Sequence, residues 1–208
     1  FMFKLILPFL FVPMPTHANG HRVGNGGTGF VCEKNSKREL RVLDLTEMSA
    51  PIEKSIENQK REVIVSKVLE NLNRLAPVLG KQYSKRFAEF DQDIEFHDDV
   101  DLTATKDTNH IASPKNCKLQ QVVIRRDQVD SVSKRFVINR DLWDLAEEKG
   151  RAALTVHEIV YEHFAKLGEK DSVKARKVTG YLLSEKAFKD EPEAFWKLIR
   201  ELKLPIYR

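Results

Sequence analysis

Apolar positions recur at helical spacing between Ala152 and Gly168, and this pattern is the strongest in the chain. At about 100° per residue, one broad face carries His157 together with Ala153, Val160, Tyr161, Phe164 and Leu167. The polar residues Thr155, Glu162 and Lys166 fall opposite, and Glu158 lies at the border. We therefore predict a helix that turns His157 toward the core and half covers Glu158. Both side chains then need partners, because burying an unpaired ionisable group is costly.

Other helices are predicted on both sides of this one. From Ile52, a core-facing stripe recurs every three or four positions, at Val65, Val68, Leu69, Leu72, Leu75 and Ala76. Pro77 ends that helix and begins the next, whose inward positions are Leu79, Tyr83, Phe87 and Phe90. Gly168 is the stop signal of the central helix. Ser172 caps a following helix that runs to about Lys186, and Glu191-Pro192 begins the last one.

Strands are predicted where β-branched or alternating runs occur, at Phe30–Cys32, Leu40–Leu45, Leu119–Arg126 and Arg135–Arg140. The last two runs are separated by a polar turn and read as a hairpin. The polar segment from Asp91 to Pro114 is interpreted as a solvated loop, with a metal-binding loop as the alternative. The chain is therefore predicted to have an α+β fold, with a small antiparallel sheet packed by about five helices.

The first residues are typical of a targeting segment. Lys4 is the only charge before the apolar run Leu5–Met14, which is too short to span a bilayer. Thr16-His17-Ala18 then places small residues at the two positions that a signal peptidase reads. We predict a signal peptide at 1–18 and a single secreted α+β domain at 19–208, located in the periplasm or outside the cell. No transmembrane span is expected after the signal is removed.

Composition narrows the classes of function. The chain is 41% hydrophobic and 32% charged, which is typical of a folded protein and not of a disordered one. Its net charge of +4 is a small excess of 35 basic over 31 acidic residues, and aromatic residues are not interleaved with the basic ones. This footprint does not favour nucleic acid as a partner. We expect an unknown envelope or extracellular partner instead.

Two cysteines, Cys32 and Cys117, are present, and an even count in an exported chain favours one disulfide. A cysteine-based metal site is the alternative, but it needs more ligands than these two residues supply.

The glycine-rich stretch from Gly24 to Gly29 matches GxGxxG formally. A dinucleotide site requires a strand before this motif and a helix after it. Here no strand is predicted before the motif, and Phe30–Cys32 reads as a strand after it, so we reject the nucleotide interpretation. The glycines instead indicate that the chain passes close to another backbone or enters a sheet edge.

The adjacent pair His157-Glu158 begins the HExxH pattern, in which two histidines bind zinc and the glutamate activates a water molecule. A short helical turn is predicted at Asp141–Leu145. The order of strands, hairpin, this short helix and the HE-bearing helix resembles the core of zincin metallopeptidases. Tyr161 stands where the second histidine belongs, and a phenol is a poor ligand at neutral pH. His163 lies about 240° further round the helix, so it cannot complete the site.

A second resemblance covers nearly the whole mature chain. The segments GNGG, LDL, CKLQQVVIRR, RFVINRDLWDLA, ALTVHEIVYEHF and DSVKARKVTGYLLS resemble a family of uncharacterised secreted proteins of predatory Gram-negative bacteria. Members share a signal peptide, a glycine-rich start, two cysteines and an HExxY helix followed by DSxxxR. The resemblance implies export and fold, and it implies no activity. Glu162 stands where the family pattern has a basic residue.

Three interpretations of the pair remain. In the first, His157 and Glu158 form a structural polar network with Tyr161 and Arg176, including a bidentate bond between Arg176 and Glu158. In the second, the chain is a non-catalytic envelope or interaction domain on a zincin-like scaffold, without a cofactor, which is compatible with the first. In the third, it is a zinc-dependent hydrolase with His157 as metal ligand and Glu158 as catalytic residue.

Overall fold

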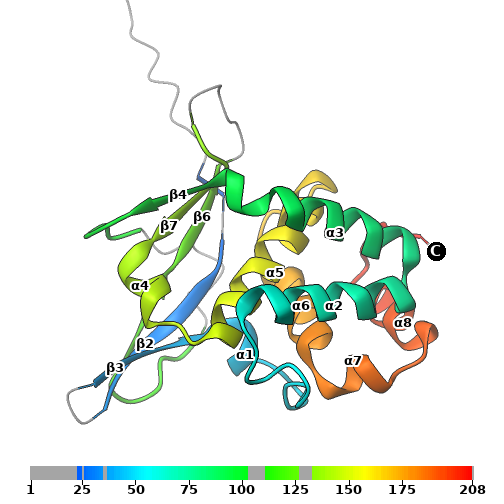
Figure 1. Ribbon diagram of the computed structural model, residues 1–208, viewed down its shortest axis with the longest axis horizontal. Helices are drawn as coiled ribbons and strands as arrows, with labels where there is room; N and C mark the ends of the chain where they lie inside the picture. Colours follow the sequence, from blue (N-terminus) through cyan, green and yellow to red (C-terminus); the bar gives the residue numbers. More distant parts are fainter. Residues whose placement is uncertain (1–22, 25, 35–36, 103–110, 127–132, 208) are drawn as a thin grey trace, which may run out of the picture.

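The structure is a computed structural model that describes residues 23–24, 26–34, 37–102, 111–126 and 133–207. The predicted signal peptide lies outside the described residues. The strands gather at one end of the molecule and most of the helices at the other, with helix α5 (Glu148–Lys166) beside the sheets (Figure 1). The predicted α+β class is confirmed.

The described strands form two small sheets, where the sequence predicted one small antiparallel sheet. The first has the order β1 (Val23–Gly24), β6 (Val123–Arg126), β7 (Phe136–Asn139) and β4 (Ile94–His97). The second has the order β3 (Lys37–Val42), β2 (Thr28–Lys34) and β5 (Cys117–Gln121), and all its pairs are antiparallel. The hairpin of β6 and β7 is confirmed, whereas β4 pairs with β7 in parallel.

Two local features explain the difference. Strand β4 lies inside the polar segment that the sequence assigned to a loop, and its partner β7 is distant in the chain. The run Leu119–Arg126 is split at Val122, because the amides of Val122 and Val123 both donate to the carbonyl of Gly27, at 2.9 and 3.0 Å. Two successive donors on one acceptor end β5 and redirect the chain into β6.

In the part of the chain that the structure describes, five helices contain ten residues or more: α2 (Arg61–Leu75), α3 (Pro77–Phe90), α5, α6 (Val173–Leu183) and α8 (Pro192–Glu201). This matches the predicted number. The described residues also include the short helices α1 (Leu43–Thr46), α4 (Arg140–Leu145) and α7 (Glu185–Lys189), and the 3-10 turn η1 (Asp91–Asp93). The predicted strand Leu40–Leu45 ends at Val42, and its second half forms α1.

Helix α5 is covered on almost every side by α2, α6, α1, β3 and β6. Gly168, just beyond its end, has φ +98°, so the predicted glycine stop is confirmed. The expected polar face is not a solvent face, because Thr155 and Glu162 are also buried. Arg86 of α3 explains this for Glu162, since its Nε donates to Glu162 Oε2 at 2.6 Å.

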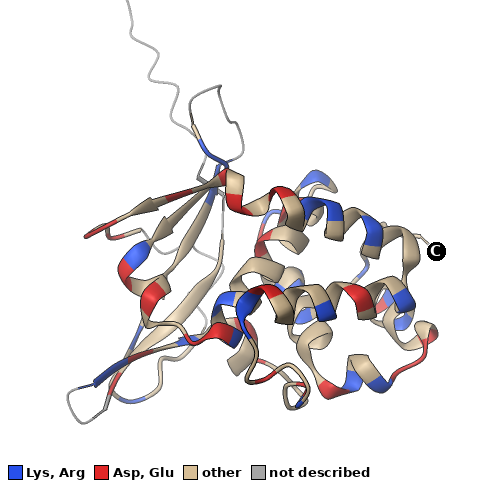
Figure 2. Ribbon diagram, in the orientation of Figure 1, with Lys and Arg blue, Asp and Glu red and all other residues tan. Residues whose placement is uncertain are grey.

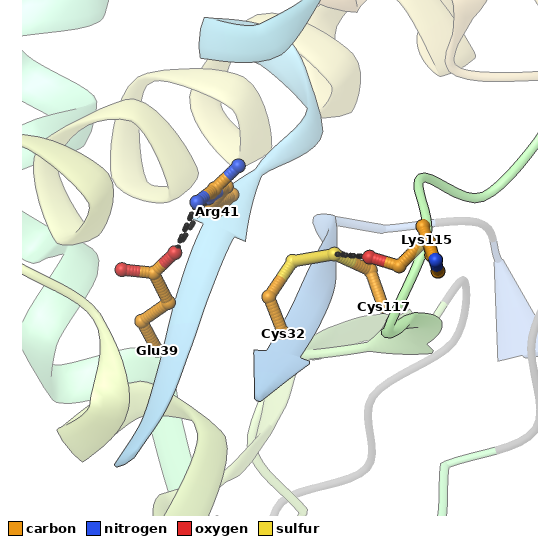
Figure 3. Close-up of a disulfide and its surroundings, with 5 residues drawn as sticks. All are labelled: Cys32, Glu39, Arg41, Lys115 and Cys117. Atoms are coloured by element: carbon orange, nitrogen blue, oxygen red, sulfur yellow. Dashed lines mark hydrogen bonds and ion pairs between the residues drawn. A yellow bond between two sulfur atoms is a disulfide. The ribbon is translucent and has the colours of Figure 1, made fainter. Parts of the chain in front are cut away.

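Cys32 and Cys117 form the predicted disulfide, between directly paired positions of β2 and β5 (Figure 3). The bond closes a loop with a sequence separation of 85. On the opposite edge of β2, strand β3 carries charged side chains such as the Glu39–Arg41 ion pair. Basic and acidic residues are interspersed over the molecule (Figure 2). Within the described ranges, every helix is too short or too polar to cross a bilayer.

Candidate functional site: the buried His157–Glu158 pair

Helix α5 directs His157 against helix α1. The imidazole Nδ1 lies 2.7 Å from Asp44 Oδ1, and the two side chains are 1% and 0% exposed. Asp44 is the second residue of α1, a single helical turn that follows β3. The sequence analysis missed Asp44, because it placed this residue inside a strand. The available signal was an acidic residue inside the otherwise apolar run around Leu43 and Leu45.

Asp44 changes the charge state that His157 prefers. Burial by itself disfavours the imidazolium and lowers its pKa. The negative charge of Asp44, its hydrogen bond and the charge of Glu158 outweigh this effect, whereas Arg176 opposes them, and the pKa of His157 is raised above its ordinary value. The arrangement therefore favours a buried imidazolium–carboxylate pair.

Glu158 is bound by the glycine-rich segment. Its Oε1 accepts a hydrogen bond from the Gly27 amide at 2.6 Å, across 131 positions of sequence, and the residue is 0% exposed. A Cβ on Gly26 would overlap with the carbonyl oxygen of Val123, and one on Gly27 would overlap with Leu154. The prediction that these glycines allow close approach to another backbone is therefore confirmed. Glu158 is fully covered, rather than half covered as predicted.

The carboxyl of Glu158 holds its proton more tightly than usual. Burial raises its pKa to about 7, although His157, the Gly27 amide and Arg125 each lower it in part. Arg125 extends from β6, with its guanidinium 5.3 Å from the ring centroid of Tyr161. Glu158 Oε2 has no hydrogen-bond partner within the described part of the chain. With the Gly27 amide on Oε1 and no described donor on Oε2, the carboxyl of Glu158 is better suited to the neutral form than to the carboxylate.

Tyr161 and Arg176 are buried in the same region. The Tyr161 ring lies 6.1 Å from the His157 ring. Arg176 Nε donates to Glu47 Oε2 at 2.8 Å, and Nη1 donates to Ser172 Oγ at 3.0 Å. The predicted bidentate bond between Arg176 and Glu158 is wrong, since it requires both carboxylate oxygens and Oε2 accepts no hydrogen bond from any described residue. The physical reason is that Glu47, at the end of α1, supplies the carboxylate that Arg176 binds.

The residues around His157 do not match a catalytic zinc centre. Such a centre uses three protein ligands. Among the described residues, no group of three or more His, Cys, Asp or Glu side chains is placed to hold a metal ion. His163, the next histidine on α5, lies near α3 instead, with its Nδ1 3.0 Å from the hydroxyl of Tyr83. A zinc ion at His157 would need ligands from elsewhere.

Comparison with protein-family models, with curated proteins and with solved structures gives no match for this chain.

Proposed function

We propose that this chain is an exported, non-catalytic binding domain of the cell envelope or extracellular space. In this proposal, His157 and Glu158 are structural residues that belong, with Tyr161 and Arg176, to a buried polar network. The observation that carries it is the burial of the pair, at 1% and 0% exposure. A catalytic side chain must touch its substrate, and neither of these can do so in the described conformation.

The partners of the pair support a structural role. Asp44 binds His157 from α1, and Gly27 binds Glu158 from the segment before β2. Both contacts join α5 to parts of the chain that precede it by more than a hundred positions. Buried polar groups with such long-range partners help to specify a unique packing. The pair therefore connects α5 to α1 and to the segment before β2, which is typical of structural residues rather than of a reaction centre.

Export is supported by the Cys32–Cys117 disulfide, because structural disulfides persist mainly in oxidising compartments. The apolar run Leu5–Met14 followed by a small-residue cleavage pattern is consistent with the same route. The periplasm and the extracellular medium remain equivalent destinations in this proposal.

The proposal is tested on purified, tag-free protein by measuring zinc content and hydrolysis together. We expect less than stoichiometric zinc after dialysis against zinc, and no hydrolysis of casein or peptidoglycan by the wild type or Glu158→Gln. His157→Ala is compared with His163→Ala, a matched histidine on the same helix. About one zinc per chain, lost only in His157→Ala, would overturn the proposal. Should His157→Ala not fold, X-ray absorption of the zinc-soaked wild type reports directly whether imidazole is bound.

A zinc-dependent hydrolase is the second candidate, and one observation favours it. In zinc enzymes a carboxylate commonly accepts a hydrogen bond from the ligating imidazole and fixes its orientation. Asp44 is placed in this way on Nδ1 of His157, and Nε2 has no hydrogen-bond partner among the described residues. Hydrolysis that depends on Glu158, together with zinc that depends on His157, would establish this candidate in place of the first.

A further inference from the structure

A cleft of about 510 Å³ lies where the junction of α2 and α3 meets the end of α5, the start of α8 and the C-terminal segment (Figure 1). The described residues that line it are nine apolar ones and four polar ones, namely Arg74, Gln82, His163 and Tyr207. A mainly apolar wall with a few polar groups, enclosing a few hundred Å³, is typical of small-molecule sites. The cleft is therefore a candidate ligand site, separate from the buried pair on α5.

Apolar side chains are left exposed at this cleft. Among the described residues, three large hydrophobic side chains are exposed, Val63 at 39%, Val78 at 73% and Tyr207 at 86%. The two most exposed, Val78 and Tyr207, both line the cleft, although they are far apart in the chain. Apolar side chains that gather from distant segments around one hollow are typical of a binding surface. Unlike His157 and Glu158, these side chains are open to contact with a ligand.

The walls of the cleft are formed by constrained backbone. Pro77 and Pro192 are the first residues of α3 and α8, where the fixed φ of proline suits a helix start. Pro205 lies in the C-terminal segment, which is anchored by the buried Leu204, whose amide donates to the carbonyl of Ile199 at 3.2 Å. A site that is formed before its ligand arrives loses little conformational entropy on binding.

The lining of the cleft contains a cation and no anion. None of the described residues that line it is an aspartate or a glutamate. Glu191 and Glu193 lie at the start of α8, outside the lining, and Glu193 is ion-paired with Arg200 at 2.6 Å. A surface with this balance favours an anionic ligand over a cationic one.

The cation is Arg74, which is exposed and whose partners among the described residues are all neutral acceptors. Its Nε and Nη2 donate to Asn71 Oδ1 at 3.0 and 2.9 Å, and Nη2 also donates to the carbonyl of Ala187 at 3.0 Å. Nη1 donates to the carbonyl of Asp190 at 2.8 Å, while the carboxylate of Asp190 accepts from Tyr181. The guanidinium is thus held in place, and its charge and the second N–H of Nη1 remain for a ligand.

The other polar groups of the lining are neutral. Burial and the charge of Lys166 lower the pKa of His163, so its imidazole is uncharged at neutral pH. Gln82 and Tyr207 contribute an amide and a hydroxyl. Arg74 is therefore the group that decides which sign of charge the ligand carries.

We propose that this cleft binds a small aromatic carboxylate. The carboxylate lies beside Arg74, and the aromatic body lies against Trp196, Tyr207 and the proline rings, because flat apolar faces suit a planar ring. The inference rests on the proposed function as a binding domain and adds its ligand class. It requires no contact with His157 or Glu158.

The test is proton–nitrogen correlation NMR of the purified protein, titrated with hydrocinnamate up to millimolar concentration. The chain contains two tryptophans, and each gives one indole N–H signal. Trp196 lines the cleft, whereas Trp143 lies in α4, outside it, and both side chains are 7% exposed. We expect the Trp196 signal to shift until the site is saturated and the Trp143 signal to stay unchanged.

Four related compounds are titrated in parallel: hydrocinnamamide, phenylpropylamine, octanoate and acetate. We expect the neutral amide and the cationic amine to bind about tenfold more weakly than hydrocinnamate or less, because each loses the charge-assisted contact with Arg74. Acetate lacks the apolar body and should not bind detectably. Octanoate should bind more weakly, since a flexible chain loses more conformational entropy; equal binding of octanoate would overturn the aromatic ligand class.

Variants locate the binding. Val78→Ser and Tyr207→Ser remove exposed apolar groups of the cleft, and Val63→Ser on α2, outside the cleft, is the matched control. We expect each cleft variant to weaken hydrocinnamate binding about fivefold, with the control unchanged. Arg74→Gln should abolish the preference for the carboxylate over the amide, and Arg74→Lys should retain it. If Arg74→Gln loses its native circular dichroism, the serine variants and the amide comparison decide.

A Trp196 signal that does not respond to hydrocinnamate overturns this inference, as does equal binding of the amide. A Trp196 signal that shifts with protein concentration instead of ligand would identify a second copy of the chain as the occupant, and would also overturn it. None of these results bears on the zinc and hydrolysis measurements, so the proposed non-catalytic function is tested separately. Conversely, hydrolysis that requires Glu158 would overturn the proposed function and leave the ligand class of the cleft intact.

Discussion

Replacing Glu158 by glutamine should stabilise the protein at alkaline pH and leave it almost unchanged at acidic pH. The pKa of Glu158 is about 7 in the folded protein, against an ordinary value of 4.5. Between these values the folded state holds a proton that the unfolded chain has released. The free energy of unfolding must therefore fall as the pH rises through this window. A difference of 2.5 pKa units corresponds to about 3 kcal/mol, which is lost in full at pH 8.

His157 contributes with the same sign. Its pKa is raised above the ordinary value of 6.5, so its stabilising contribution is fully present below pH 6.5 and is lost as the pH rises through the folded pKa. The wild type should consequently be more stable near pH 5.5 than near pH 8. Glutamine reproduces the neutral carboxyl, because its oxygen can still accept from the Gly27 amide. The variant removes the contribution of Glu158 and retains that of His157.

Urea unfolding followed by circular dichroism at pH 5, 6, 7 and 8 measures the effect. We expect Glu158→Gln to be within about 1 kcal/mol of the wild type at pH 5 and up to about 3 kcal/mol more stable at pH 8. Glu162→Gln on the same helix is the control, because the pKa of Glu162 is shifted in the opposite direction to that of Glu158. Although burial raises the pKa of Glu162, its bonds to Arg86 and Lys166 lower it on balance. That variant should lose stability at pH 8, and progressively less as the pH falls below 4.5 toward the lowered pKa of Glu162 in the folded protein.

A Glu158→Gln variant that is destabilised by the same amount at pH 5 and pH 8 would refute this reasoning. It would mean that Glu158 is ionised in the folded protein and bound by a positive partner. Arg125 would then be the candidate for that partner, and activation of a zinc-bound water by Glu158 would be the next role to test.

Three further predictions follow from single contacts. Replacing Cys32 and Cys117 by serine should lower the free energy of unfolding by about 4 kcal/mol, because the bond closes a long loop; two alkylatable thiols in the native wild type would contradict it. Gly27→Ala should destabilise by more than Gly168→Ala, since a Cβ on Gly27 would overlap with the packed side chain of Leu154, whereas a Cβ on Gly168 meets no neighbour and is strained only through the φ of +98°; a chemical denaturation series that ranks them in reverse would contradict it. Asp44→Ala should cost about 3–5 kcal/mol by leaving His157 without its buried partner; a loss below about 1 kcal/mol in urea unfolding would argue against an ion pair.

Features with local causes could be predicted from the sequence. The inward face of α5, the stop at Gly168 and the β6–β7 hairpin all follow from residues close together in the chain. The Cys32–Cys117 bond followed from a count of two, which leaves one pairing.

Features with distant causes were missed. Strand β4 has a polar sequence and acquires its conformation from pairing with β7. The partners of His157 and Glu158 lie 113 and 131 positions away, and one of them is a backbone amide that no side-chain pattern reveals. Arg176 was paired with Glu158 of the preceding helix, whereas the fold brings Glu47 to it.

The position of Gly27 has a consequence for the order in which the protein can fold. Its amide binds Glu158, and its carbonyl receives the amides of Val122 and Val123 and the side chain of Gln121. These contacts span 94 to 131 positions of sequence. The junction of the two sheets with α5 therefore cannot close during synthesis until residue 158 has left the ribosome. Contacts with such long separations form slowly, because the closure entropy must be overcome first.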